Sequence, residues 1–387
     1  MPVDPGGATH QSDQLIVDLQ HLETVETMLR DIGIRHTDLA SDDQDDLLGL
    51  ARLRELRDVG GGALEVEEIL ALLRQKAAAD RGGWEPTIGK NRVVDAVIGV
   101  GHKPMSLAIG GVAVSGHKPM AGAEPEPVDA ADIPQVLLSS PDAGRGVRVG
   151  VVDTPRAPAE PGTFEHPVPY RAGHAEFVSS LIRREALAAE IFVEGVLDAT
   201  TGRADSWDTA RAMLRLAATR KLDILNLSFG CYTLSGGPPL VIARAIERLG
   251  RQVLVVAAAG NHGALDHLTA GRTGRSACWP AAIPPVVAVG AVDDSGSSPP
   301  WSPDLPWVTC LAPGVDVIGS YLRGEVDVDG KVRSFDGHAR WSGTSFSAAL
   351  VTGAVAGRTV PGSVSPQQAL AQLLAEGALV RPYTKGC

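Results

Sequence analysis

The sequence is poor in the features that mark several large classes of protein. Its 387 residues include 4 cysteines, and no pair of them has the CxxC or CxxH spacing of a zinc site. They give no disulfide framework either, so we expect buried or incidental thiols. No apolar run reaches the roughly 18 residues that a membrane-spanning helix requires. The sequence therefore argues against a disulfide scaffold and predicts no transmembrane helix.

Basic residues are scarce relative to acidic ones. The chain has 35 Lys and Arg against 46 Asp and Glu, and its formal net charge is −11. Charge of this sign argues against nucleic acid or an anionic membrane as the main partner. The first residues, "MPVDPGGATHQSDQ", lack the basic and apolar regions of a secretory signal. We therefore expect a cytoplasmic protein, with export by another route left open.

Residues 1–100 are charged and periodic, and they predict a small N-terminal α+β domain. Apolar residues recur at helical spacing in 22–33 and 64–80, and strands are expected at 13–20, 48–56 and 91–100. A helix is nearly as consistent with the pattern of 48–56. The resulting order of elements is a split βαβ pattern, for which a ferredoxin-like fold is one candidate.

Residues 101–145 are rich in Gly, Pro and Ala, which is typical of an exposed linker. The segment GHKPM occurs at 101–105 and again at 116–120. His102 and His117 are metal ligands in principle, but no carboxylate or cysteine stands beside them at ligand spacing. We interpret the repeat as part of the linker and predict no metal site and no cofactor.

Strands and helices alternate along residues 146–387. Apolar runs predict strands at 147–153, 189–198, 222–230, 252–261 and 285–292, and helices are expected at 174–187, 206–221 and 238–250. Such alternation implies an α/β fold with a doubly wound parallel sheet. Folds of this kind bind their ligands at the carboxyl ends of the strands.

Polar residues stand where that topology predicts a site. Asp153 ends the first of these strands, His174 begins a helix, and Asn261 ends the fourth strand. Ser345 opens a run of small and apolar residues, "TSFSAALVTG", that is typical of a helix packed closely on a sheet. Packing alone explains small residues there, but a nucleophile also needs such room for its substrate.

Seven segments of the sequence favour a catalytic role for Ser345 over a role in packing alone. They resemble, in order, successive blocks of the subtilisin-like serine protease family (peptidase S8). The segments, which cover nearly all of residues 147–377, are "VGVVDTP", "GHAEFVSSLI", "NLSFG", "VVAAAGNHG", "WPAAIPPVVAVGAVD", "LAPGVDVIGS" and "WSGTSFSAALVTG". The resemblance implies a subtilisin-like fold and a serine endopeptidase that hydrolyses peptide or protein substrates through an acyl-enzyme.

The resemblance also assigns residues. Asp153, His174 and Ser345 match the family's catalytic triad, and Asn261 matches its oxyanion-hole asparagine. The residues that match substrate-binding positions are Ser228, Phe229 and Gly230 at a strand edge, and Ala258 and Gly260 at the first specificity pocket. In these roles His174 accepts the serine proton, Asp153 holds the imidazole, and Asn261 donates to the oxyanion.

The chain departs from the family's pattern near the expected base. His174 is followed by Ala175 and Glu176, where the family has Gly and Thr, so Glu176 is expected beside the imidazole or the substrate. The short segment between Asp153 and His174 leaves little room for the family's calcium-site loop. His166 is the competing histidine, but no helix follows it.

Three alternatives to a subtilisin-like peptidase fit the sequence less well. A catalytically silent module that keeps the fold to bind a peptide or a partner stays open, although all four catalytic positions are filled. The sedolisin-type peptidases share the SGTS block but lack the base and the asparagine, so His174 and Asn261 argue against that family. A dinucleotide-binding oxidoreductase loses its support because no GxGxxG follows the first strand.

The N-terminal zone has two candidate roles. Many proteases of this family carry a β-α-β-β-α-β propeptide, and residues 13–100 show a similar order. We therefore expect an intramolecular inhibitory or fold-assisting domain, released by cleavage within 101–145. The linker could enter the cleft as an extended strand beside Ser228–Gly230. A permanent recruitment domain is the alternative.

Overall fold

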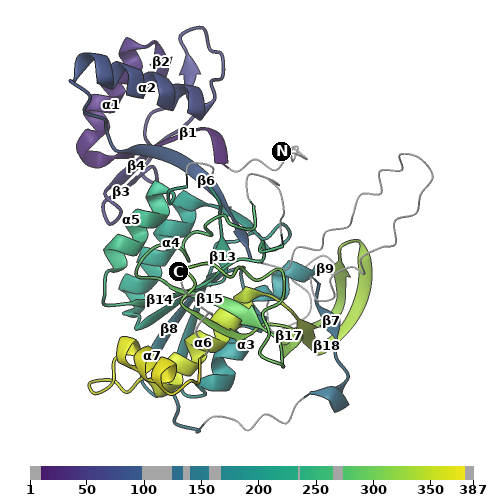
Figure 1. Cartoon of the computed structure of the whole chain (residues 1–387). Helices are drawn as coiled ribbons and strands as arrows, with labels where there is room; N and C mark the ends of the chain where they lie inside the picture. The colour runs from purple at the N-terminus through teal and green to yellow at the C-terminus, as the bar shows by residue number, and fades with distance from the viewer. Residues whose placement is uncertain are drawn as a thin grey trace.

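The structure is a computed structural model, and it describes residues 10–97, 124–133, 140–156, 167–233, 236–264 and 273–379. A small N-terminal domain sits on one end of a larger domain (Figure 1). The repeated GHKPM segments, with His102 and His117, lie outside the described residues, and so does His166. Among the described helices, none combines the length and the apolar character that crossing a bilayer requires.

The N-terminal domain is a split βαβ unit. Its elements are β1 (His10–Asp18), η1 (Leu19–His21), α1 (Leu22–Asp31), β2 (Ile34–Arg35), β3 (Gln44–Asp45), β4 (Leu50–Leu53), β5 (Arg57–Asp58), α2 (Val66–Asp80) and β6 (Ile88–Ala96). Four strands lie in the order β6-β1-β4-β3 with every neighbouring pair antiparallel, as in a ferredoxin-like fold. The segment 48–56 therefore contains a strand and no helix.

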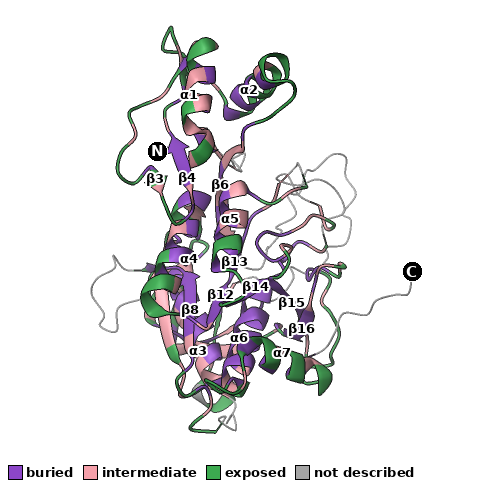
Figure 2. Ribbon diagram, turned by 90° about the vertical axis from the view of Figure 1, so that its left-hand side faces the viewer, coloured by how far each residue is buried: buried purple, intermediate pink, exposed green. Residues whose placement is uncertain are grey.

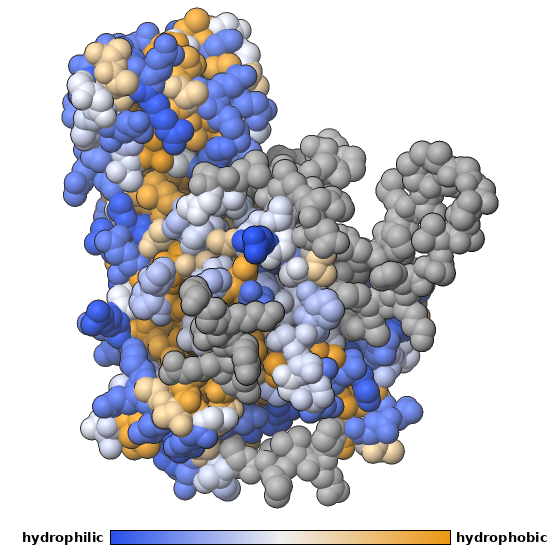
Figure 3. All heavy atoms as spheres, viewed as in Figure 1, coloured by the Kyte–Doolittle hydropathy of each residue, from blue (hydrophilic) through white to orange (hydrophobic). Residues whose placement is uncertain are grey.

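Strand alternation gives the N-terminal sheet two apolar faces. Leu15 and Val17 of β1 pack with the helices α1 and α2 in the core of the small domain. Ile16, between them, belongs to a different cluster that includes Trp207 of the larger domain. One apolar face of this sheet is covered by the domain's own helices. The other apolar face has to be covered by the larger domain to be buried from water. The face of the domain in Figure 3 is mostly hydrophilic, with a few apolar patches.

The larger domain is built on a six-stranded parallel sheet. Its order is β10-β8-β12-β14-β15-β16, and the bounds are β8 (Arg148–Asp153), β10 (Glu190–Gly195), β12 (Ile224–Leu227), β14 (Leu254–Ala258), β15 (Val287–Val292) and β16 (Cys310–Pro313). All neighbouring pairs are parallel. The chain runs from β8 to β10 on one side and later returns to β12 on the other, so the predicted doubly wound topology is confirmed.

Helices cover both faces of this sheet. Their bounds are α3 (His174–Glu185), α4 (Ser206–Arg220), α5 (Leu240–Leu249), α6 (Thr344–Arg358) and α7 (Pro366–Ala375). Val149 and Val151 of β8 pack into the cluster with α3 and α6, and Val152 packs into the cluster with α4 and α5. Figure 2 shows the resulting buried layer along β8, β12 and β14.

A long hairpin lies beside α3. It consists of β17 (Val317–Val328) and β18 (Lys331–Trp341), with β9 (Val168–Pro169) on one edge and β7 (Glu126–Pro127) on the other. Because β7 pairs with β18, part of the segment expected to be a linker belongs to the larger domain. The remaining short elements are η2 (Ala130–Asp132), η3 (Tyr170–Gly173), β11 (Arg203–Asp205) and β13 (Phe229–Gly230).

The small domain docks on α4 and α5 through apolar and charged contacts. Leu48 and Leu50 join the apolar cluster of those helices. The carboxylate of Asp18 accepts a hydrogen bond from the Arg244 guanidinium at 2.8 Å. The Arg211 guanidinium donates to Asp45 at 3.0 Å. The two domains are therefore held by a packed interface as well as by the covalent chain.

Candidate active site

The three residues expected to form the triad come from separate elements that meet at one edge of the sheet. Asp153 is the last residue of β8, His174 is the first residue of α3, and Ser345 lies in the first turn of α6. All three are fully buried. β8 is also the strand at which the winding of the sheet reverses, which is where open α/β sheets form their sites.

Asp153 and His174 form a buried hydrogen-bonded pair. The Nδ1 atom of His174 lies 2.7 Å from Oδ1 and 2.9 Å from Oδ2 of Asp153. The Thr154 N–H donates to the same carboxylate at 2.7 Å and fixes its position. An imidazole that donates from Nδ1 presents Nε2 as a proton acceptor. The rings of Trp341 and Phe346 pack against the imidazole, with centroids at 5.6 and 5.8 Å.

The Ser345 hydroxyl is engaged by backbone carbonyls. Its Oγ donates to the Val97 carbonyl at 2.7 Å and lies 3.1 Å from the Ser228 carbonyl. The Nε2 atom of His174 is buried and has no hydrogen-bond partner among the described residues. The acid–base pair is thus formed, whereas the hydrogen bond between serine and histidine is not.

Asn261 directs an amide donor at the same carbonyl. Its Oδ1 accepts hydrogen bonds from the backbone N–H and the hydroxyl of Thr344, at 3.0 and 3.1 Å. With Oδ1 occupied in this way, Nδ2 faces the Val97 carbonyl at 3.3 Å. The amide donor and the Ser345 hydroxyl therefore meet at one carbonyl oxygen, and the amide has the position that one donor of an oxyanion hole requires.

Val97 reaches this point because β6 continues out of the small domain as an extended strand. β11 pairs with one edge of β6 through the register Arg203↔Asp95, and β13 pairs with the other edge through Phe229↔Ala96. The Val97 N–H also donates to the Ser228 carbonyl at 3.0 Å. The end of β6 thus lies between two strands of the larger domain, as a bound peptide does in β-augmentation.

The five residues expected to bind substrate do not all lie along β6 in the structure. Phe229 and Gly230 pair with the end of β6, whereas the Ser228 side chain bonds to Asn226 and to the Ser345 carbonyl and only its backbone meets Val97. Ala258 packs in the core cluster with α3 and α6. Gly260 has a φ of +99°, and a Cβ there would lie 2.6 Å from the His262 ring.

Glu176 does not contact the imidazole by any hydrogen bond or ion pair described here. Its carboxylate pairs with the Arg156 guanidinium at 2.9 Å. Glu176, which was expected beside the imidazole or the substrate, is therefore paired with Arg156 instead. Nothing in the sequence singled out this arginine. Sequence reasoning also missed Val97 and Thr344, because Val97 is separated from Ser345 by 248 positions and no local pattern links them.

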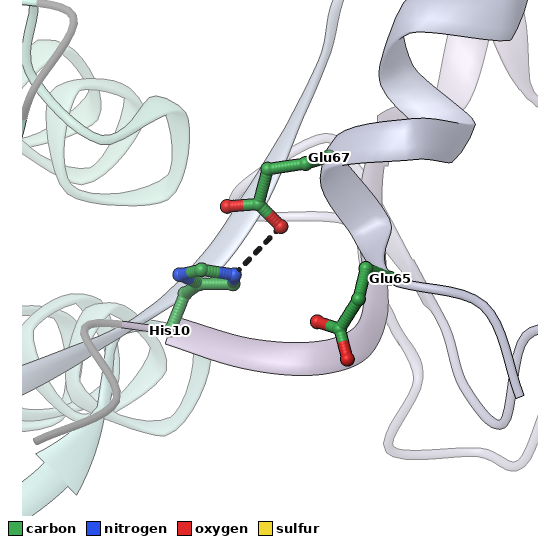
Figure 4. A group of neighbouring side chains, drawn as sticks. All are labelled: His10, Glu65 and Glu67. Carbon is green, nitrogen blue, oxygen red and sulfur yellow. Dashed lines mark hydrogen bonds and ion pairs between the residues drawn. The ribbon is translucent and has the colours of Figure 1, made fainter. Parts of the chain in front are cut away.

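One further cluster has the composition of a metal site. His10, Glu65 and Glu67 place one ligand atom each within 4.8 Å of one another (Figure 4). The Glu67 carboxylate is already paired with His10 Nε2 at 2.9 Å and with the Lys90 ammonium. A bound cation would lie against that ammonium. The contacts are those of an ion-pair network between β1, α2 and β6.

Comparisons with known proteins identify the family of the larger domain. The model of the subtilase family (peptidase S8) matches residues 175–378, which is more than half of the chain. Subtilisin E of Bacillus subtilis (strain 168) is 28% identical over 171 residues, covering 44% of this chain and 39% of that protein. A subtilisin of Bacillus pumilus is 27% identical over 171 residues, covering 44% of this chain and 54% of that protein.

The solved structures give a wider match. Fervidolysin from Fervidobacterium pennivorans, described as a keratinolytic enzyme related to subtilisin, aligns with a TM-score of 0.59 at 15% identity. The alignment covers 96% of this chain and 58% of that one, and it supports the fold alone. The chain spans about half or less of the length of the curated relatives it matches. The family model covers most of the larger domain, and on that match the chain belongs to the subtilase family.

Proposed function

We propose that this protein is a serine endopeptidase in which Asp153, His174 and Ser345 form the catalytic triad. The observation that carries the proposal is the convergence at the Val97 carbonyl. A serine hydroxyl and an amide donor contact the same peptide oxygen, and a buried Asp–His pair lies in the same site. A module that only binds peptides needs the strand edges but has no use for that pair.

The proposed reaction begins when the Ser345 hydroxyl turns from the Val97 carbonyl to His174 Nε2, which has no hydrogen-bond partner among the described residues. His174 Nε2 takes the proton of Ser345 as Oγ attacks the carbonyl carbon, and the carbonyl oxygen becomes an oxyanion. The Asn261 amide donates to that oxygen. The imidazolium then gives its proton to the leaving amine, and the C–N bond breaks to leave an acyl-enzyme. A water molecule, deprotonated by His174, hydrolyses the ester and restores the serine.

The small domain acts as an intramolecular inhibitor in this proposal. Its strand β6 occupies the cleft, and the first scissile bond is Val97–Ile98. That bond lies just before the range 101–145 that the sequence suggested. Support comes from the pairing of β6 on both edges and from the burial of Ser345. A permanent recruitment domain gives no reason for a peptide carbonyl at the nucleophile.

Labelling with a fluorophosphonate probe tests the activity. We expect the protein to react once β6 leaves the cleft and the Ser345→Ala variant to remain unlabelled. The Asn226→Asp substitution is not a suitable control, since Asn226 contacts Ser228. Ser363→Ala is a matched control that should label like wild type, because Ser363 is exposed in the loop between α6 and α7. Equal labelling of wild type and Ser345→Ala would contradict the assignment.

A further inference from the structure

The end of β6 shows which peptides the cleft is shaped to accept. Val97 supplies the carbonyl that Ser345 contacts, so Val97 holds position P1, and Ala96, Asp95 and Val94 hold P2, P3 and P4. These positions rest on the proposed peptidase function. The backbone pairing of β11 and β13 with this segment does not depend on its side chains, so selection must come from what those side chains contact.

The Val97 side chain has close neighbours at Gly230. A Cβ atom added to Gly230 would lie 2.4 Å from Cys278 Sγ and 3.3 Å from a methyl group of Val97. The thiol and the valine methyl thus both lie within 3.3 Å of the point where a Gly230 Cβ would stand, and the Trp279 carbonyl lies 3.7 Å from that point. Val97 and Cys278 are both buried. A longer or aromatic P1 side chain would have to displace the thiol.

The P3 position is read by charge. The Arg203 Nε atom donates to Asp95 Oδ1 at 2.7 Å, and Arg203 lies directly opposite Asp95 in the pairing of β11 with β6. Both side chains are about half exposed, at 43%. Exposed pairs contribute modestly, so we expect a preference of up to about five-fold for an acidic residue at P3. The P4 residue Val94 is buried in the apolar cluster that contains Phe229 and Trp207.

We infer that the enzyme cleaves on the carboxyl side of small aliphatic residues, that Cys278 limits the P1 pocket, and that Arg203 selects an acidic P3 residue. Side chains too large for an apolar pocket are disfavoured, and one methylene too many costs about 10- to 200-fold in specificity. Phenylalanine at P1 should therefore be disfavoured against valine by about ten-fold or more.

Processing of the full-length chain tests the P1 pocket. The rate at which an N-terminus appears at Ile98 is measured for wild type, Val97→Ala and Val97→Phe. Val97→Ala should process at a rate near that of wild type, and Val97→Phe about ten-fold or more slowly. Adding Cys278→Gly should restore processing of Val97→Phe, whereas Cys278→Ser, which keeps a group of similar size, should not. Equal rates for Val97→Phe and wild type would overturn the inference.

Peptides supplied in trans test both positions independently of folding. The substrates are Val-Asp-Ala-Xaa p-nitroanilides with Xaa as valine, alanine, leucine or phenylalanine, and the same set with lysine in place of aspartate. Wild type should prefer valine and alanine, and aspartate over lysine by up to about five-fold, with Arg203→Glu reversing the charge preference. A processed, probe-labelled enzyme that prefers phenylalanine would reject the specificity alone. An enzyme that neither labels nor cleaves would reject the peptidase function with it.

Discussion

At the scale of single residues, the orientation of the Asn261 amide decides whether the oxyanion has a donor. Thr344 accounts for that orientation, because its N–H and its hydroxyl both donate to Asn261 Oδ1. The Thr344 hydroxyl itself accepts a hydrogen bond from the Gly260 N–H at 3.1 Å. In the proposed peptidase, Thr344 is therefore a positioning residue for Asn261, which is expected to contact the substrate.

Substitutions at Asn261 and Thr344 should both lower kcat, but by different factors. Asn261→Ala removes the donor and should lower kcat about 10²- to 10³-fold with little change in KM. Thr344→Val keeps the shape but loses two hydrogen bonds, the one donated to Asn261 Oδ1 and the one accepted from the Gly260 N–H, so a decrease in kcat of about ten-fold is expected. Steady-state kinetics on one peptide substrate measure both. A change confined to KM would mean that Asn261 only binds substrate.

The triad residues should behave as a unit. Ser345→Ala and His174→Ala should each abolish turnover, and the double variant should be no worse than either single one, because the hydroxyl has no base without the imidazole. Turnover of a peptide by the three variants, with circular dichroism as the check on folding, measures this. Additive losses would show that the two side chains act separately.

At the scale of elements, the N-terminus of α4 depends on a residue from the other domain. Asn91 in β6 is fully buried, and its Oδ1 accepts hydrogen bonds from the Trp207 N–H at 3.0 Å and the Ser206 hydroxyl at 2.9 Å. The first N–H groups of a helix lack partners within it. β6 therefore supplies α4 with an acceptor while its other end lies in the cleft.

Removing that acceptor should loosen the docked domain. Asn91→Ala leaves two buried donors without the acceptor they share, at a cost of about 1–3 kcal/mol for each donor left unsatisfied. Chemical denaturation of full-length protein in the Ser345→Ala background should detect the loss of stability. Gln14→Ala is the matched control, because it removes only the bond that Asn91 Nδ2 donates to Gln14. Equal losses from both variants would assign the effect to the small domain alone.

The elements of the parallel sheet could be predicted from the sequence because each has its own local pattern. The runs at 147–153 and 252–261 are buried strands, and the amphipathic spacing of 206–221 gives α4 to within a residue. The hairpin of β17 and β18 was missed, although Asp329-Gly330 is a turn signal. Both residues have positive φ, 50° and 80°, as the two-residue loop between Val328 and Lys331 requires.

The site was only partly predictable, for a physical reason. Asp153, His174, Asn261 and Ser345 stand at element ends, where topology brings them together. The contact of Val97 with Ser345 depends on how the small domain docks on the larger one. The charged and apolar contacts of that interface join residues that are far apart in the chain. The ion pair of Arg156 with Glu176, and the position of Cys278 next to Gly230, likewise have no local signal in the sequence.

At the scale of the whole molecule, the domain interface contains carboxylates whose charge matters for docking. Asp18 is the last residue of β1, and its carboxylate accepts a hydrogen bond from Arg244 of α5. Burial by itself would raise the pKa of Asp18, but the Arg244 guanidinium and the Gln20 N–H outweigh it, and the pKa lies below the ordinary 3.8. A carboxyl with a lowered pKa stabilises the docked state above its ordinary value, and that stabilisation disappears as the pH falls through the lowered pKa.

Acid should therefore weaken the grip of the small domain. We expect docking to be stable above about pH 4 and to weaken below it, as carboxylates such as Asp18 become protonated. Binding of a processed small domain to the larger one, followed by light scattering across pH 3–7, measures the effect. Asp18→Asn should weaken docking at neutral pH and reduce the pH dependence. A pH dependence equal to that of wild type would show that Asp18 does not contribute.

The most direct test of the account is the N-terminus of the mature chain. Intact-mass spectrometry and N-terminal sequencing are applied to wild type and to Ser345→Ala after identical expression. The geometry at Val97 predicts that wild type yields a chain beginning at Ile98 together with a fragment ending at Val97, and that Ser345→Ala stays at 387 residues. Cleavage at the same bond in Ser345→Ala, or a fully active wild type that remains uncut with β6 in place, would contradict it.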